Sequence, residues 1–342
     1  MVRFTRAINV AEKKKIGQQT SRTNFTIHGT DMSLESKILC FTEGKPTKRK
    51  TVKLIRWLQN KKLLKKKIRC KLCQNAMKLK KKHNSTDVYR WVCRHKSHRG
   101  RKITKTIRTG SVFENSKCSL ISWMKFFYRF SQGLRLRQVD MKTDGIAKSS
   151  TTLSKMAACA RRVCRHAMKR HETKTGKCLG DEREFVVIDE SNFRHKRKYG
   201  RGRISNSWRR KNWVFGMLGV KGKHRRPLLK LVKRRSRNHL LPLVVKHVRP
   251  GTVIISDEWR AYRGALTNLG YTHFTVNHSR WFVDPVTGAH TQQLERAWLT
   301  YKSIIWRLRG NRTEKLLKEH LAVIEWTYWL ETGIGKDLLV VY

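Results

Sequence analysis

The stretch FVVID at residues 185–189 decides the fold of the C-terminal half of the chain. An unbroken apolar run that ends in an acid is typical of a β-strand buried on both faces by helices. The stretch TVIISD at residues 252–257 has the same character. Segments with strand and helix patterns alternate around these two, so we predict an α/β domain.

Within this domain we expect three strands, a helix, a strand, a helix, a strand and then helices. The strands are predicted at 185–188, 213–221, 228–233, 252–256 and 271–276, and the helices at 238–248, shortly before Gly270, at 291–308 and at 316–331. Pro242 is expected in the first turn of its helix, because a proline deeper inside would lose a backbone hydrogen bond.

Acidic residues are rare in this chain, which makes their positions informative. Asp189 and Asp257 end the two buried strands, and open α/β sheets place functional groups at the carboxyl ends of strands. Glu295, at the border of the apolar face of its helix, is the candidate third carboxylate. From spacing alone, Glu190 or Glu258 could replace its neighbour, and helix capping or plain solvation would also explain such acids.

Neighbouring carboxylates raise each other's pKa unless a cation neutralises them, and Mg²⁺ prefers oxygen ligands of this kind. Three carboxylates that leave water positions open could hold two ions. Two ions can clamp the attacking and leaving oxygens of a phosphodiester. The three acids therefore predict metal-dependent phosphodiester chemistry.

The charge of the whole chain indicates a polyanionic partner. Its 342 residues include 79 Lys and Arg against 23 Asp and Glu, a formal charge of +56. Nucleic acid or an anionic membrane surface would screen this charge. No run of 18 apolar residues predicts a membrane span, and residues 1–15 lack the apolar core of a secretion signal. We therefore expect a nucleic-acid protein inside a cell, with reduced cysteines.

Basic residues are concentrated in the N-terminal half. Residues 45–110 contain 25 Lys and Arg and a single acid, Asp87. The clusters at 45–50 and 61–67 can contact phosphates or act as nuclear-import signals, although any one such cluster is as often a solvated face. A nuclear location is expected in a eukaryotic host, and the cytoplasm or nucleoid in a bacterial host.

Cys70 and Cys73 form a C-x-x-C pair, and Cys93 and His98 follow at zinc-ribbon spacing. Lysines and arginines around them favour the thiolates that a metal requires. His95 is the rival fourth ligand, but a single residue between it and Cys93 makes a cramped chelate. We predict one structural Zn²⁺, against the alternative of reduced cysteines without a metal.

Three helical patterns follow the ribbon, and Ser149 or Ser150 is the candidate N-cap of the third. The patterns cover residues 119–132, 136–141 and 150–167. The break at Thr143–Gly145 precedes a basic helix, as in a helix-turn-helix that enters the major groove of DNA. A plain helical bundle is the alternative. Cys159 and Cys164 on the third helix are expected to pack in its core.

Five segments form an ordered set of motifs. They are IRTGSVFE (107–114), VVIDESNFRHKRKYGRGR (186–203), WVFGMLG (213–219), LLPLVVKHVRPGTVIISDEWRAY (240–262) and YTHFTVNHSRWFVDPVTGAHTQQLERAWLTYK (271–302). In order and spacing they resemble the Merlin superfamily of DNA transposases and the related bacterial insertion-sequence transposases. The resemblance covers roughly residues 65–330.

This resemblance implies an RNase H-like catalytic domain with three catalytic acids. Asp189 in IDES corresponds to the first acid, Asp257 in SDEWRAY to the second, and Glu295 in HTQQLERAW to the third. The resemblance favours Asp257 over Glu258. It also implies a Cys near position 98, so that His98 is a conservative exchange of one metal ligand for another.

The sequence departs from the family pattern in two places. KCLGDEREF precedes the IDES motif where the family usually has a Gly-rich segment, and Gln292 and Gln293 occupy the place where Asn is frequent. Neither departure removes a metal-binding carboxylate.

The resemblance implies a cut-and-paste DNA transposase that binds terminal inverted repeats, hydrolyses phosphodiesters at the transposon ends and joins the 3′-hydroxyl to target DNA. The three acids would hold two Mg²⁺ or Mn²⁺ ions, and at least a homodimer would join both ends. Candidate DNA contacts are Lys65, Lys66, Lys67, Arg161, Arg162, Lys196, Lys198, Arg201 and Arg203. The rival functions are a domesticated, non-catalytic DNA-binding protein and a nuclease that cuts without joining.

These inferences divide the chain into five expected regions. They are a polar tail at 1–44, a basic zinc-ribbon region at 45–115, a helical DNA-binding domain at 116–178, the RNase H-like catalytic domain at 179–332 and a C-terminal tail at 333–342.

Overall fold

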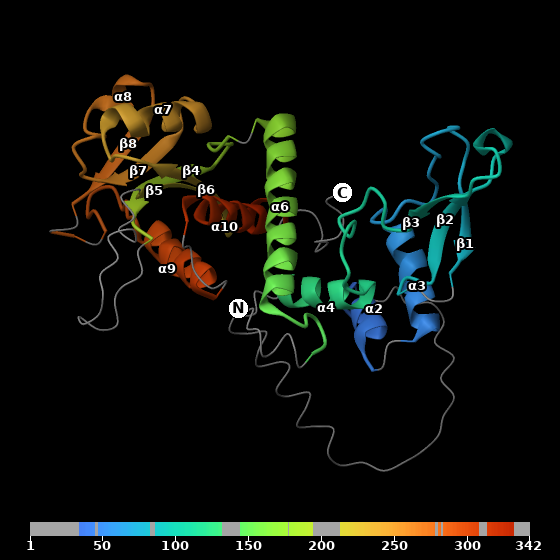
Figure 1. Cartoon of the computed structure of the whole chain (residues 1–342). Helices are drawn as coiled ribbons and strands as arrows, with labels where there is room; N and C mark the ends of the chain where they lie inside the picture. The colour runs from blue at the N-terminus through green and yellow to red at the C-terminus, as the bar shows by residue number, and fades with distance from the viewer. Residues whose placement is uncertain are drawn as a thin grey trace, which may run out of the picture. The chain divides into compact units, whose positions relative to one another are not determined.

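The computed structural model describes several stretches of the chain, all within the second of its two units, Leu34–Tyr342 (Figure 1). The described residues are 34–44, 47–82, 86–131, 144–176, 178–193, 213–277, 280–281, 283–307 and 313–331. Two expectations lie outside them, the helix at 136–141 and the C-terminal tail at 333–342. So do four of the candidate DNA contacts, Lys196, Lys198, Arg201 and Arg203.

The C-terminal part of the chain contains a five-stranded sheet of order β6-β5-β4-β7-β8. Its strands are β4 (Phe185–Ser191), β5 (Trp213–Lys221), β6 (His224–Val232), β7 (Val253–Asp257) and β8 (Thr272–Val276). Neighbouring strands among β4, β5 and β6 pair antiparallel, while β4, β7 and β8 run parallel. The apolar residues 186–188 are fully buried, as expected for a strand covered on both faces.

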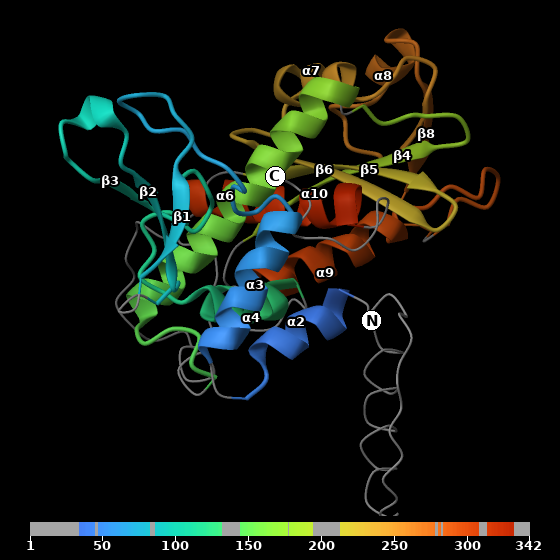
Figure 2. The same cartoon turned by 90° about the vertical axis from the view of Figure 1, so that its right-hand side faces the viewer.

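Helices cover both faces of this sheet (Figures 1 and 2). On one face are α7 (Arg237–His247) and α8 (Ala265–Asn268), and on the other α9 (Gln292–Arg307) and α10 (Glu314–Trp326). Side chains alternate along β4, so that Val186 and Ile188 pack on the α7 face and Val187 on the α9 face. The α/β class and the order of elements agree with the sequence prediction.

The expected position of Pro242 is wrong. The helix α7 begins at Arg237, so Pro242 lies inside it and not in its first turn. A proline at this point has no N–H for the carbonyl four residues earlier, that of Asn238. Asn238 is exposed, so water can hydrogen-bond to that carbonyl, and the helix tolerates the proline.

Four helices from the N-terminal half form a separate core. They are α2 (Leu34–Thr42), α3 (Lys48–Asn60), α4 (Leu120–Ser131) and α6 (Ser150–Thr175). Aromatic residues of α4, with Phe113 just before it, fill the centre, and Val323 and Trp326 of α10 also belong to this core. The helix α10 thus packs on the sheet with one side and on α6 with the other.

Helices α2 and α3 correct the expectation for this region. The expected polar tail at 1–44 is helical over Leu34–Thr42, and the basic stretch after it is helical over Lys48–Asn60. Leu54, Ile55 and Leu58 form a buried stripe on α3 at helical spacing. The many lysines and arginines around this stripe hide it when the sequence is judged by charge alone.

The long helix α6 has well-defined ends. Ser149 is its N-cap, because its hydroxyl accepts the N–H of Thr152 at 3.2 Å, and Gly176 ends it in the left-handed conformation. Cys159 and Cys164 on this helix are buried, as expected, whereas Cys40 is exposed. None of the helices in the described ranges is long and apolar enough to cross a membrane.

The ribbon is a small three-stranded antiparallel sheet of order β1-β2-β3. Its strands are β1 (Lys78–Lys81), β2 (Tyr89–Cys93) and β3 (Ile103–Thr106). Its own core is small: Ile68, Cys70, Met77, Trp91 and Cys93, with Ile103 beside them. A core of this size needs a metal or another cross-link for stability.

Candidate active site and metal centre

Asp189 and Asp257 lie side by side near the carboxyl ends of two adjacent parallel strands, Asp189 two residues before the end of β4 and Asp257 at the end of β7. Val187 of β4 pairs with Ile255 of β7, and continuing that register by two residues places Asp257 level with Asp189. Side chains two residues apart on a strand point to the same face of the sheet. Asp189 therefore shares a face with Val187 and Asp257 shares a face with Ile255, and this is the face that α9 covers. The two carboxylates therefore share one edge and one face of the sheet.

The helix α9 brings Glu295 to the same face. Glu295 lies in the first turn of α9, where the helix dipole favours a negative charge, and the hydroxyl of Thr291 donates to its Oε1 at 3.0 Å. Leu294 and Trp298 on either side are buried against the sheet. Glu295 itself is exposed and Asp257 is half-buried, so a large substrate can approach both.

The pKa of Asp189 is shifted by its burial and by the two nearby acids. Burial raises the pKa of Asp189 to about 6, and the negative charges of Asp257 and Glu295 push in the same direction. Two hydrogen bonds oppose the rise, from the indole Nε1 of Trp298 at 2.8 Å and from the backbone N–H of Glu190 at 2.7 Å. A cation between these carboxylates would relieve their repulsion.

Trp298 fits against β5 because residue 216 is a glycine. Gly216 pairs with Asp189 across the two strands, and a Cβ at position 216 would lie 2.4 Å from the indole ring. The missing side chain leaves room for the ring, which packs edge-on against Phe193 and Tyr301. The sequence predicts Trp298 only as part of the apolar face of its helix, although its spacing of three from Glu295 places it one turn further along the same helix.

Glu190 has a different role from its neighbour because it points to the opposite face. It accepts a hydrogen bond from the hydroxyl of Tyr262, and its Oε2 lies 3.8 Å from a guanidinium nitrogen of Arg235. Burial raises its pKa to about 8, with further contributions from Asp189 and Asp257. Glu258, the other alternative, follows β7 and is exposed. Because side chains alternate along β4, Asp189 and Glu190 point to opposite faces of the sheet, and only Asp189 lies on the α9 face.

The all-oxygen donor set of Asp189, Asp257 and Glu295 fits a hard divalent cation such as Mg²⁺. Among the described residues, the ligand atoms of the ribbon form the one set in which all atoms lie within 4.8 Å of one another. The oxygens of the three carboxylates are therefore spaced more widely than that. Direct ligation of one ion by all three acids therefore requires them to move closer together.

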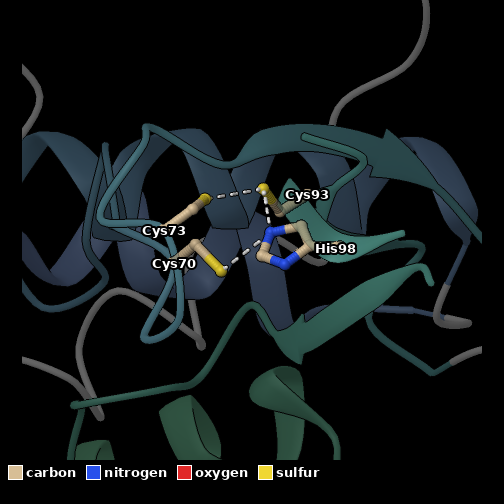
Figure 3. Close-up of side chains that lie close together, drawn as sticks. All are labelled: Cys70, Cys73, Cys93 and His98. Carbon is tan, nitrogen blue, oxygen red and sulfur yellow. Dashed lines mark hydrogen bonds between the residues drawn. The ribbon is translucent and has the colours of Figure 1, made fainter. Parts of the chain in front are cut away.

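The four predicted zinc ligands converge in the ribbon (Figure 3). The Sγ atoms of Cys73 and Cys93 are 3.6 Å apart, and the Nε2 of His98 lies 3.3 Å from Cys93 Sγ and 3.6 Å from Cys70 Sγ. Sulfur ligands about 2.3 Å from a tetrahedral zinc ion are about 3.8 Å apart, so this spacing matches a zinc site closely.

The structure favours His98 over His95 as the fourth ligand. His98 is buried at the end of a 3-10 turn, Lys96–His98, whereas His95 is exposed and its Nδ1 lies 2.8 Å from the hydroxyl of Ser97. Backbone N–H groups of Cys73 and Leu72 lower the pKa of the Cys70 thiol. A thiolate at Cys70 is the form that binds a metal.

The candidate DNA contacts lie in different surroundings. Lys65, Lys66 and Lys67 are exposed beside the ribbon. Arg162 is exposed on α6, whereas Arg161 is largely buried and pairs with Glu319 of α10 at 2.8 Å. Arg161 therefore joins two helices, and in this structure its charge is balanced by an acid.

Two known protein families match the chain, one over the three candidate acids and one over the Cys₃His cluster. Residues 176–327 match the ISXO2-like transposase domain. This segment contains all three candidate acids and supports a DDE transposase. Residues 63–114 match the recombinase zinc beta ribbon domain and contain the four zinc-ligand candidates. Together with the Cys₃His cluster, that match supports a structural zinc ion and binding to DNA.

No curated protein matches the chain. The narrower resemblance to the Merlin superfamily stays a prediction, since the matching domain family is the ISXO2-like one.

Proposed function

We propose that the protein is a DNA transposase whose C-terminal domain has an RNase H-like fold. The sheet supports this proposal, with three antiparallel strands followed by two parallel ones in the order β6-β5-β4-β7-β8. The proposal rests on one observation above all: Asp189 and Asp257 lie level with each other near the carboxyl ends of adjacent parallel strands, on the face where α9 supplies Glu295.

In this proposal Asp189, Asp257 and Glu295 hold Mg²⁺ or Mn²⁺. When bound, the ions supply Lewis-acid activation of the attacking oxygen and stabilise the leaving oxygen. Trp298 fixes one oxygen of Asp189, and the backbone N–H of Trp259 donates to Asp257 Oδ1 at 3.2 Å. Thr291 fixes one oxygen of Glu295. The backbone N–H of Glu190 holds the other oxygen of Asp189, so these bonds fix both oxygens of Asp189 and one oxygen each of Asp257 and Glu295.

The chain needs no covalent intermediate with DNA for this chemistry. Water hydrolyses the phosphodiester at the transposon end and leaves a 3′-hydroxyl, which then attacks a phosphodiester of target DNA. The basic N-terminal half and its ribbon bind the terminal inverted repeats, with phosphate contacts supplying most of the affinity. A homodimer brings two ends together, and the protein acts in the nucleus of a eukaryotic host or in the nucleoid of a bacterial one.

Strand joining from a precut end tests this proposal. Duplexes are made from the inverted repeats that flank the gene, with a free 3′-hydroxyl, and incubated with the full chain, Mg²⁺ and supercoiled plasmid. We expect plasmid molecules covalently joined to the duplex. A nuclease would cut DNA without joined product, and a non-catalytic protein would bind the duplex and do neither. Either outcome would refute the proposal.

A further inference from the structure

A basic turn leaves the sheet at its catalytic edge. The strand β6 ends at Val232, which pairs with Trp213 at the start of β5. The next residue of β5, Val214, pairs with Ser191 at the end of β4. The segment Lys233–Arg237, of sequence KRRSR, therefore emerges at the edge where β4 and β7 deliver their acids.

The middle of this turn is anchored by Arg235. Its guanidinium lies 4.1 Å from the ring centre of Trp213 and 4.6 Å from that of Trp259, so it is held between two indoles. It also faces the buried Glu190 at 3.8 Å. The indole Nε1 of Trp259 donates to the carbonyl of Arg235 at 3.1 Å. These contacts fix the backbone of the turn.

Further bonds tie the turn to the segment that follows Asp257. The guanidinium of Arg237 donates to the carbonyl of Ala261 at 3.2 Å and to those of Arg260 and Arg263 at 3.4 and 3.2 Å. Trp259, which contacts Arg235, also donates its backbone N–H to Asp257. The turn and the backbone around the second acid therefore form one connected structure.

Four cations on this structure point to solvent. Lys233, Arg234, Arg260 and Arg263 are exposed, and no ion pair within the described ranges involves any of them. Bringing four like charges together is unfavourable unless a polyanion lies beside them. The turn is anchored on the α7 face, at the sheet edge that it shares with the candidate acids on the α9 face. A DNA strand that crosses this edge to reach the acids is a polyanion that would fit this position.

We propose that Lys233, Arg234, Arg260 and Arg263, here called the edge cluster, bind the phosphate backbone of the DNA strand that enters the active site, with Arg235 as the anchor that holds the cluster in place. This inference rests on the proposed function and adds to it a DNA contact outside the ribbon and the helical region.

The test compares two pairs of substitutions on the same sheet. Lys233→Gln with Arg234→Gln removes two charges of the edge cluster. Lys221→Gln with Lys223→Gln removes two exposed charges from the β5–β6 turn, at the opposite edge. Affinity for a duplex is measured at several salt concentrations, in the full chain and without divalent metal, so that no DNA is cut.

Each phosphate contact contributes about one unit to the slope of log affinity against log salt. We expect the edge pair to reduce this slope by about two, and the control pair to leave it unchanged. Arg260→Gln with Arg263→Gln is a second edge pair with the same expectation. If the edge pairs keep the wild-type slope, or the control pair loses as much, the edge cluster is not a DNA site.

This binding test and the joining test fail independently. If the wild-type chain joins DNA but both edge pairs show the wild-type salt dependence of affinity, the edge cluster alone is refuted. If both edge pairs reduce the salt dependence but the wild-type chain never joins a precut end, the DNA site stands and the transposase proposal is refuted.

Discussion

At the scale of single residues, the first acid depends on a tryptophan and a glycine that are distant in sequence. In the described part of the chain, the side-chain donor to Asp189 is Trp298, whose ring occupies the space left by Gly216. The same helix supplies Glu295, so the docking of α9 sets the positions of two acids together. Trp298 is a positioning residue in this account.

Replacing Trp298 with phenylalanine tests this role. Trp298→Phe removes the N–H and leaves Oδ2 of the buried Asp189 without its donor, which costs about 1–3 kcal/mol of stability. We expect a lower rate of strand joining and a higher Mg²⁺ concentration for half-maximal rate, since the carboxylate is less well oriented. The Mg²⁺ dependence separates orientation from a simple loss of folded protein.

Trp306→Phe is the matched control, because Trp306 lies on the same helix with more than half of its surface exposed. We expect it to change stability by less than about 0.5 kcal/mol and to leave the Mg²⁺ dependence unchanged. An equal shift of the Mg²⁺ dependence in both variants would contradict a special role for Trp298.

At the scale of elements, the ribbon depends on its metal. Five buried residues form its core, and four side chains of the ribbon bring their ligand atoms together at one centre. Small metal domains of this kind gain much of their folding free energy from the ion. Loss of one ligand therefore affects the whole three-stranded sheet.

His98→Ala is expected to abolish stoichiometric zinc and to unfold the ribbon, while His95→Ala retains both. Elemental analysis of the purified proteins measures the zinc, and protection of the β1–β3 segment from limited proteolysis reports the folded ribbon. Wild-type protein without zinc, or equal zinc in the two variants, would show that the Cys₃His cluster is not the metal site.

An ion-pair network fastens the entry to β4. Arg226 of β6 donates to Glu184 at 2.6 and 2.9 Å and to Asp181 at 2.6 Å, and Arg249 also pairs with Asp181. Burial alone would raise the pKa of Asp181, but the hydrogen bond and charge of Arg226 outweigh it and leave the pKa lowered. The network ties the residues that precede β4 to β6 and to the segment that precedes β7.

The lowered pKa of Asp181 predicts a loss of stability in acid. A carboxyl group whose pKa is depressed in the folded state adds stability above its unfolded pKa, and that stability is lost as the pH falls through the folded pKa. The unfolding free energy should therefore decrease below about pH 4. Asp181→Asn should make this decrease smaller, as measured by urea denaturation at several pH values.

Glu182→Gln is the control for the loss of one negative charge, since Glu182 is the exposed neighbour of Asp181. Glu182→Gln should show the same decrease of unfolding free energy in acid as the wild type. If Asp181→Asn also shows the full decrease, the ion-pair network does not contribute to acid sensitivity.

At the scale of the whole molecule, the charge of +56 is distributed over distinct structures. Lysines and arginines surround the ribbon, others line the exposed side of α3, and the edge cluster lies at the same sheet edge as the candidate acids. Under the proposed function the protein would meet two transposon ends and a target, and several basic surfaces would suit binding to several DNA segments.

The sequence predicts the α/β sheet well because buried strands and amphipathic helices leave periodic patterns. It also places Asp257 correctly at a strand end, whereas β4 continues two residues past Asp189 to Ser191. The bond between Trp298 and Asp189 could not be predicted, because it depends on how α9 docks over Gly216. The pairing of Arg161 with Glu319, 158 residues away, likewise depends on tertiary packing and not on the local pattern.

The most direct test of the central claim is strand joining by Asp257→Asn beside Glu258→Gln. The two substitutions remove one negative charge each from adjacent positions, but only Asp257 is placed with Asp189 on the α9 face. We expect Asp257→Asn to abolish the joined product from a precut end while still binding the duplex, and Glu258→Gln to join at close to the wild-type rate. Joining that persists in Asp257→Asn would contradict the account.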